Sequence, residues 1–206
     1  MKRWTLVLAA ILGSAQALVS TQAFANDPII LGTPATGGTG CPAGAASVTV
    51  APDGSAISLL FDNFVAQAGG TVRMARKVCS ISVPVHVPQG FQVAILQIDY
   101  RGFNSVPNGG LNQFNAEYFW AGAVGPKYTK NFFFDPANPT GADYLVTNKL
   151  AVSSLVWTPC GADINLRTNA SIMSRSNFRG EQAMMTVDSA DITAGIIYQL
   201  QWRSCN

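Results

Sequence analysis

The sequence has little of the chemistry from which most active sites are built. Its 206 residues include one histidine, His86, and two glutamates, Glu117 and Glu181. A zinc site built on several histidines is therefore excluded. A Ser-His-Asp triad would have to use His86, and the chain has no G-x-S-x-G nucleophile turn to accompany it. Because His86 lies between Val85 and Val87 in an alternating run, we interpret it as a strand residue of the scaffold.

Paired carboxylates are not excluded by this composition. Two acids suffice for glycoside cleavage, so the 11 acidic residues leave a carbohydrate-active hydrolase open as an alternative function. No motif supports that alternative, because most of the aspartates stand beside turn-forming residues. The sequence therefore favours a non-enzymatic protein, and it contains no motif for which we would expect a cofactor.

The chain also lacks an excess of charge. It carries 13 Lys and Arg against 11 Asp and Glu, a formal net charge of +2. Lys2 and Arg3 lie in a segment that we expect to be removed, which leaves 13 − 2 = 11 basic residues and a net charge of zero. Nucleic-acid binding requires a clustered basic patch, and only Arg73, Arg76 and Lys77 are close together in the sequence. We interpret these three as a solvated loop and expect no nucleic-acid partner.

Long apolar runs are absent except at the N-terminus. Two basic residues, an apolar run from Trp4 to Leu12 and the small residues of Ala23-Phe24-Ala25 predict a secretory signal peptide over residues 1–25. The run is much shorter than the roughly 20 residues that a membrane span requires. We therefore expect an exported protein, secreted or periplasmic, without a membrane span. The remaining 206 − 25 = 181 residues fit one domain: a flexible leader rich in Gly, Pro and Thr over 26–40, and a β-domain over 41–206.

Four cysteines follow the predicted signal peptide: Cys41, Cys79, Cys160 and Cys205. An even number of cysteines in an exported chain indicates two disulfides. Three pairings are possible and the sequence does not choose among them; we favour Cys41–Cys79 and Cys160–Cys205, because each joins neighbouring segments. A zinc site with four thiolate ligands is the competing interpretation, but no C-x2-C pair is present to support it.

The rest of the chain alternates between β-prone runs and turns. Apolar and polar residues alternate from Ala46 to Phe61 around the turn Pro52-Asp53-Gly54, and again from Cys79 to Val87, where Pro84 favours a strand at a sheet edge. No long stretch with a 3.6-residue period occurs after the signal peptide. We count about nine or ten short strands, which predicts an antiparallel β-sandwich, with a closed β-barrel as the alternative.

Aromatic residues are the best candidates for a binding surface. The rings that we select are Tyr118, Trp120, Trp157 and Trp202. Such rings stack on sugars or anchor proteins, since they combine a large contact area with few rotatable bonds. Core packing is the alternative for each ring. A glycan or a cell-surface protein is the partner that this hypothesis predicts.

Two acidic loops are candidates for a calcium site, because calcium needs only oxygen ligands. The first contains Asp135, Asn138 and Asp143, and the second contains Asp188 and Asp191. Neither matches the EF-hand pattern, and Asp and Asn are also common turn residues. An exposed, rigid loop over 135–143 would also suit a secreted inhibitor-like protein that binds a partner.

Short motifs along the chain resemble a known family. They are Gly40-Cys41-Pro42, Pro52-Asp53-Gly54, Phe61-Asp62-Asn63-Phe64, Cys79, Val87-Pro88-Gln89-Gly90-Phe91, Asp99-Tyr100-Arg101-Gly102, Thr158-Pro159-Cys160-Gly161, Val187-Asp188-Ser189 and Gln201-Trp202-Arg203-Ser204-Cys205. In this order they resemble the exported family called domain of unknown function 4360. Val78 stands where we would expect a polar residue such as Asn. The resemblance implies a secreted, disulfide-containing β-domain of bacteria and fungi, with no established activity and no site to carry over.

Together these features predict an exported, non-enzymatic β-sandwich that acts by binding or as a surface component, in contact with envelope or extracellular polymer.

Overall fold

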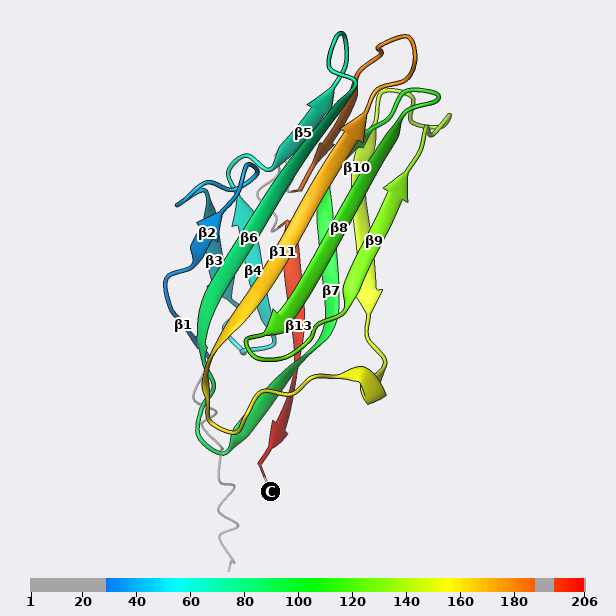
Figure 1. Cartoon of the computed structure of the whole chain (residues 1–206). Coiled ribbons are helices and arrows are strands. Elements are labelled where there is room, and N and C mark those ends of the chain that lie inside the picture. The colour runs from blue at the N-terminus through cyan, green and yellow to red at the C-terminus, as the bar shows by residue number, and fades with distance from the viewer. Residues whose placement is uncertain (1–28, 188–194, 206) are drawn as a thin grey trace, which may run out of the picture.

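The computed structural model describes residues 29–187 and 195–205, and in these residues the fold is all-β (Figure 1). They form thirteen strands and one 3-10 turn, η1 (Val152–Ser154). The strands are β1 (Ile30–Leu31), β2 (Ala35–Gly37), β3 (Ala46–Val50), β4 (Ala56–Phe61), β5 (Val65–Ala68), β6 (Met74–His86), β7 (Phe91–Ser105), β8 (Leu111–Trp120), β9 (Lys127–Phe132), β10 (Ala142–Lys149), β11 (Asp163–Arg175), β12 (Ala183–Thr186) and β13 (Ile196–Ser204). The alternation of apolar and polar residues did not predict three short strands, β1, β2 and β5.

The strands form two antiparallel sheets that pack face to face. The six-stranded sheet has the order β1-β6-β11-β8-β9, with β2 also paired to β6. The seven-stranded sheet has the order β3-β4-β13-β7-β12-β5, with β10 also paired to β7. The sheets do not close into a barrel, so the predicted β-sandwich is confirmed and the barrel alternative is wrong. Within the described residues, no helix has the length and apolar character needed to cross a bilayer.

The core lies between the sheets because the strands alternate. β8 alternates half-buried and buried residues along its whole length, and β4 does the same. The inward residues include large aromatic side chains whose hydroxyls find partners: the Tyr198 hydroxyl lies 2.6 Å from Thr168 Oγ1, and Asn148 donates to the Tyr118 hydroxyl over 2.9 Å. Burial raises the pKa of both tyrosines. These polar contacts satisfy groups that would otherwise be costly to bury.

Two disulfides join segments of the sandwich that are far apart in the sequence. Cys41 pairs with Cys79 and Cys160 pairs with Cys205, with Cα–Cα distances of 5.2 and 6.0 Å. The favoured pairing is thus confirmed. The first bond ties the segment after β2 to β6, and the second ties the segment before β11 to the end of β13. With sequence separations of 38 and 45 residues, each loop closure stabilises the fold by about 4 kcal/mol in the chain-entropy model.

Part of the predicted flexible leader, 26–40, requires correction. Ile29 is buried, and β1 and β2 pair with β6. The reason is that β6 has backbone carbonyls along its outer edge that need donors: Gly32 N donates to Pro84 O and Gly40 N donates to Val78 O. β6 is therefore not an edge strand, and the prediction from Pro84 is wrong. Pro84 is tolerated because it lies between the stretches that pair with β1 and β2, where its missing N–H removes no bond of either ladder. The predicted signal peptide, 1–25, and residues 26–28 lie outside the described residues.

Candidate functional site on the outer face of the six-stranded sheet

The four aromatic candidates do not form one platform. Tyr118 and Trp120 are 1% and 2% exposed, because the alternation of β8 points both into the core. Their predicted contact with a ligand is therefore wrong. Trp157 is half-buried, with the Arg203 guanidinium 4.1 Å from the centre of its ring. Trp202 points to the opposite side of β13 from Arg203, where its Nε1 donates to Gly54 O over 3.0 Å. A binding role for these last two rings stays a prediction.

The first calcium candidate is organised as a turn. The two carboxylate oxygens of Asp135 accept hydrogen bonds from Ala137 N and Asn138 Nδ2, both over 2.9 Å, and these bonds lower the pKa of Asp135. Asp135, Asn138 and Asp143 all line one surface hollow of 200 Å³. In the described part of the chain, no group of three His, Cys, Asp or Glu side chains could hold a metal ion. Asp188 and Asp191 lie outside the described residues. Partner binding by the loop 135–143 stays a prediction.

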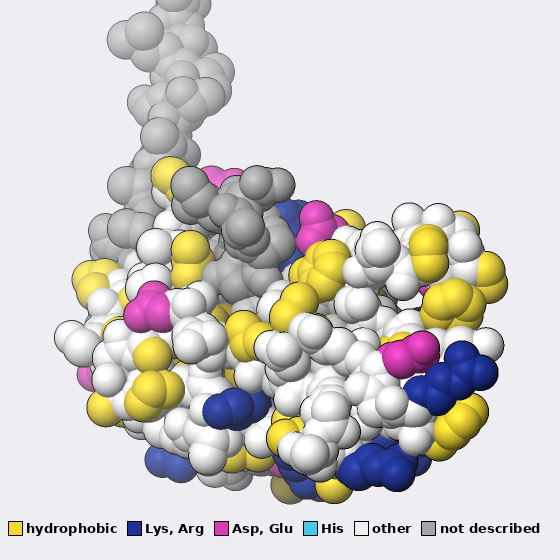
Figure 2. Space-filling view, turned by 90° about the horizontal axis from the view of Figure 1, so that it is seen from above, with side chains coloured by type: hydrophobic (Ala, Val, Ile, Leu, Met, Phe, Trp, Pro, Cys, Tyr) yellow, Lys and Arg dark blue, Asp and Glu magenta, His cyan; other side chains and the backbone are white. Residues whose placement is uncertain are grey.

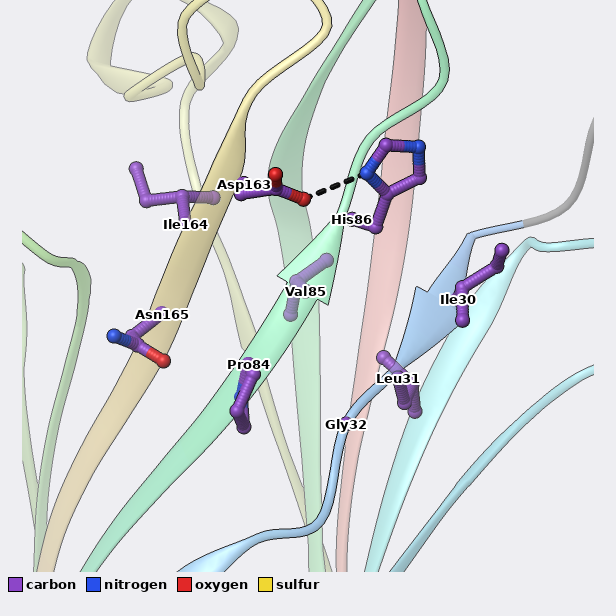
Figure 3. A pocket seen from close by; sticks show the side chains of 9 residues that line it. All are labelled: Ile30, Leu31, Gly32, Pro84, Val85, His86, Asp163, Ile164 and Asn165. Atoms are coloured by element: carbon purple, nitrogen blue, oxygen red, sulfur yellow. Dashed lines mark hydrogen bonds and ion pairs between the residues drawn. The ribbon is translucent and has the colours of Figure 1, made fainter.

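The single histidine belongs to a surface pair that sequence reasoning missed. The register of β6 and β11 sets Asp163 opposite His86, and His86 Nδ1 lies 2.6 Å from Asp163 Oδ1 (Figure 3). Their side chains are 43% and 87% exposed, so the pair contributes little to stability. No local signal could have found it, because 77 residues separate the two partners.

A hollow of 440 Å³ lies beside this pair, at the edge that β1 covers. Figure 3 shows Ile30 and Leu31 reaching it from β1, and Pro84 from β6. Its lining residues include no serine, threonine or cysteine that His86 could activate. Asp163 therefore holds His86 through Nδ1, but the residues that line the hollow do not supply the nucleophile of a hydrolytic triad.

A second hollow, of 410 Å³, lies farther along the same face, where β6, β11, β8 and β9 run side by side (Figure 1). The register sets Ser80, Asn169, Glu117 and Lys127 in one row across the four strands, and Val78, Ser171, Asn115 and Thr129 in the next. These outward positions are occupied mainly by amides and hydroxyls. We call the surface formed by these eight residues and the following row, Arg76, Met173, Gln113 and Asn131, the polar face.

Hydrogen bonds hold three amides of the polar face, Gln113, Asn115 and Asn131, in fixed orientations. Gln113 Nε2 donates to Asn131 Oδ1 over 2.9 Å. Asn115 Nδ2 donates to Gln113 Oε1 over 3.0 Å, and Asn115 Oδ1 accepts from Thr129 Oγ1 over 2.8 Å. Each amide still has donor or acceptor capacity left over for a ligand. The polar face is thus a preorganised array of hydrogen-bonding groups.

The polar face carries three charged side chains, Arg76, Glu117 and Lys127, and each has a polar partner. Lys127 Nζ lies 3.6 Å from Glu117 Oε1, and Arg76 Nη2 donates to Ser171 Oγ over 3.3 Å. Glu117 is level with Asn169 on β11, six residues from Asp163, so the two carboxylates are about 20 Å apart along the strand. Glycosidase carboxylate pairs are separated by about 5–9.5 Å. These two acids therefore do not form such a pair.

Comparisons with known proteins support the sequence resemblance. The model of a family described as "Domain of unknown function (DUF4360)" matches residues 29–205. The chain is also similar to a protein of the fungus Arthroderma benhamiae (strain ATCC MYA-4681 / CBS 112371) described as "Uncharacterized secreted protein". The two are 30% identical over 171 residues, which cover 82% of this chain and 69% of the relative.

Proposed function

The chain belongs to the family described as domain of unknown function DUF4360, and that description names no activity. We therefore propose a function from the side chains that this protein exposes on its polar face. The protein is an exported, non-enzymatic binding protein that contacts a polyhydroxylated extracellular or envelope polymer through the polar face. Its two disulfides and the secreted fungal relative support export.

The observation that carries this proposal is the hydrogen-bonded array of amides and hydroxyls on the polar face, of which Asn115 and Thr129 line the 410 Å³ hollow. Sugar hydroxyls both donate and accept hydrogen bonds, as amide and hydroxyl side chains do. Fixed amides lose little rotamer entropy when a ligand binds. β6 spans 13 residues, about 40 Å, so this side of the sheet is long enough for several sugar rings of an extended polymer.

The experiment is a pull-down with insoluble chitin, cellulose, β-glucan and peptidoglycan. The test variant is Asn115→Ala with Asn169→Ala, and the control is Gln201→Ala, which removes an exposed amide from the seven-stranded sheet. At about 1 kcal/mol for each lost hydrogen bond, the double variant should weaken binding about thirty-fold, while the control should bind as the native protein does. The proposal fails if no polymer is retained, or if the double variant and the control bind equally.

A further inference from the structure

Three loops meet at the end of the sandwich where β6 begins and β11 ends, and they form one surface (Figure 1). The turn between β5 and β6 is joined to the loop between β11 and β12, since Gly70 N donates to Gly180 O over 2.8 Å and Ser176 N donates to Arg73 O over 3.1 Å. Asn177 Nδ2 donates to Asn108 O in the loop between β7 and β8 over 2.9 Å. We call residues 69–74, 106–110 and 175–182 the loop end.

Apolar side chains protrude from the loop end. Phe178 is 77% exposed, Met74 is 60% exposed and Val72 is 49% exposed. Figure 2 looks onto this end of the molecule, and toward its lower right yellow hydrophobic side chains lie beside dark-blue Lys and Arg side chains. Exposed apolar side chains that gather on one surface indicate contact with a partner or a lipid phase.

The same surface is basic. Arg73 and Arg175 are exposed, and β-sheet register sets Arg175 opposite Met74. The Arg179 guanidinium lies 5.4 Å from the centre of the Phe178 ring. Among the described residues, none of these three arginines has a salt bridge to a carboxylate, and the single acid of the loop end, Glu181, accepts a hydrogen bond from Asn177. The sequence had grouped Arg73 only with its neighbours; the fold adds two arginines from a segment about a hundred residues later.

Phe178 is held in place by its neighbour. Asn177 is buried, and its Oδ1 accepts from Arg179 N and from Glu181 N, both over 3.1 Å. The loop is therefore shaped before any partner arrives, which lowers the entropy cost of binding.

We propose that the loop end is a docking surface for an anionic lipid bilayer, with Phe178, Met74 and Val72 entering the interface and Arg73, Arg175 and Arg179 at the level of the headgroups. Charge complementarity supports this occupant, since arginines beside a negative surface each strengthen binding by about five-fold. A small-molecule ligand fits less well: the 530 Å³ hollow between the two loops is lined by glycine backbone, Val72, Ala68 and glutamines, without a charged side chain. The proposal does not depend on polymer binding by the polar face.

The test is co-sedimentation of the full protein with vesicles of phosphatidylcholine alone or with 30% phosphatidylglycerol. We expect binding to the anionic vesicles only, and its loss at 0.5 M NaCl because salt screens the arginines. Arg175→Gln with Arg179→Gln should weaken binding about 25-fold, and Phe178→Ser about ten-fold.

Matched controls lie at the opposite end of the sandwich. Val152→Ser replaces a side chain that is exposed as fully as Phe178, and Lys149→Gln removes a charge there; neither should change binding. A Phe178→Trp variant should gain a blue-shifted fluorescence component on anionic vesicles. The proposal is overturned if anionic vesicles do not bind the protein, if the controls weaken binding as much as the test variants, or if the arginine variant binds normally. Salt-sensitive binding that Phe178→Ser leaves unchanged would also overturn it, by indicating a polyanion rather than a bilayer.

Discussion

A buried hydrogen bond between Thr168 and Tyr198 joins the two sheets. Thr168 lies in β11 of the six-stranded sheet and Tyr198 in β13 of the seven-stranded sheet, and their hydroxyl oxygens are 2.6 Å apart inside the core. Tyr198→Phe would leave the Thr168 hydroxyl without this partner, and Thr168→Val would do the same to the Tyr198 hydroxyl. Since a buried unsatisfied polar group costs about 1–3 kcal/mol, we expect each single variant to lower the free energy of unfolding by about 2 kcal/mol.

The double variant, Thr168→Val with Tyr198→Phe, completes a double-mutant cycle. The cycle isolates the free energy of the interaction between the two side chains from the other effects of each substitution. With both polar groups gone, nothing in the pair is left unsatisfied, so the double variant should lose only the net contribution of the hydrogen bond, about 1 kcal/mol. The coupling energy between Thr168 and Tyr198 should then be about 3 kcal/mol.

Urea denaturation followed by tryptophan fluorescence would measure the three free energies, with the slope m as a check that the unfolded state is unchanged. Additive single effects, or a loss below about 0.5 kcal/mol for Tyr198→Phe, would refute the reasoning, because the hydroxyls would then have other partners or access to water.

Two further predictions follow from the core. Burial raises the pKa of Tyr100, Tyr118, Tyr144 and Tyr198 above the ordinary value of 10, so their contribution to stability is complete below pH 10 and is lost above it, by about 1.4 kcal/mol per pH unit for each tyrosine. Circular dichroism should therefore show cooperative unfolding by about pH 12, together with phenolate absorbance; free titration near pH 10 in a folded protein would contradict this. Gly102→Ala should lower the free energy of unfolding by about 1–3 kcal/mol, because its Cβ would stand 2.2 Å from Thr186 O. Gly37→Ala, whose Cβ would meet nothing within 4 Å, is the control for this urea experiment, and equal losses would show that the close approach is not the cause.

Much of the fold could be predicted because strand alternation is local. The alternating stretch predicted from Ala46 to Phe61 forms β3 and β4, and Pro52-Asp53-Gly54 marks the turn between them. β1 was missed because two residues carry no periodic signal and the strand exists only where β6 offers carbonyls. The number of strands therefore depends on pairing between segments that are far apart in the sequence, and short-range periodicity does not report such pairing.

The candidate site was predicted less well, for the same reason. Alternation fixes that Tyr118 and Trp120 share a side of their strand, but not whether that side faces the core or the solvent. The polar face needed the order β6-β11-β8-β9, which brings together segments from four parts of the chain. The pairing of β6 with β11 also explains why His86 lies beside Asp163, which is 77 residues away in the sequence.

The sequence by itself determined the β-class of the described residues, the family resemblance and the presence of cysteines for two bridges, since these depend on residue type and short-range period. Only the tertiary structure decided which faces are buried, that Trp120 packs inside while Phe178 protrudes, and that Arg73 lies beside a loop a hundred residues later. Those features depend on which strands become neighbours, and strand neighbours are chosen by the burial of whole sheets against one another rather than by any single segment.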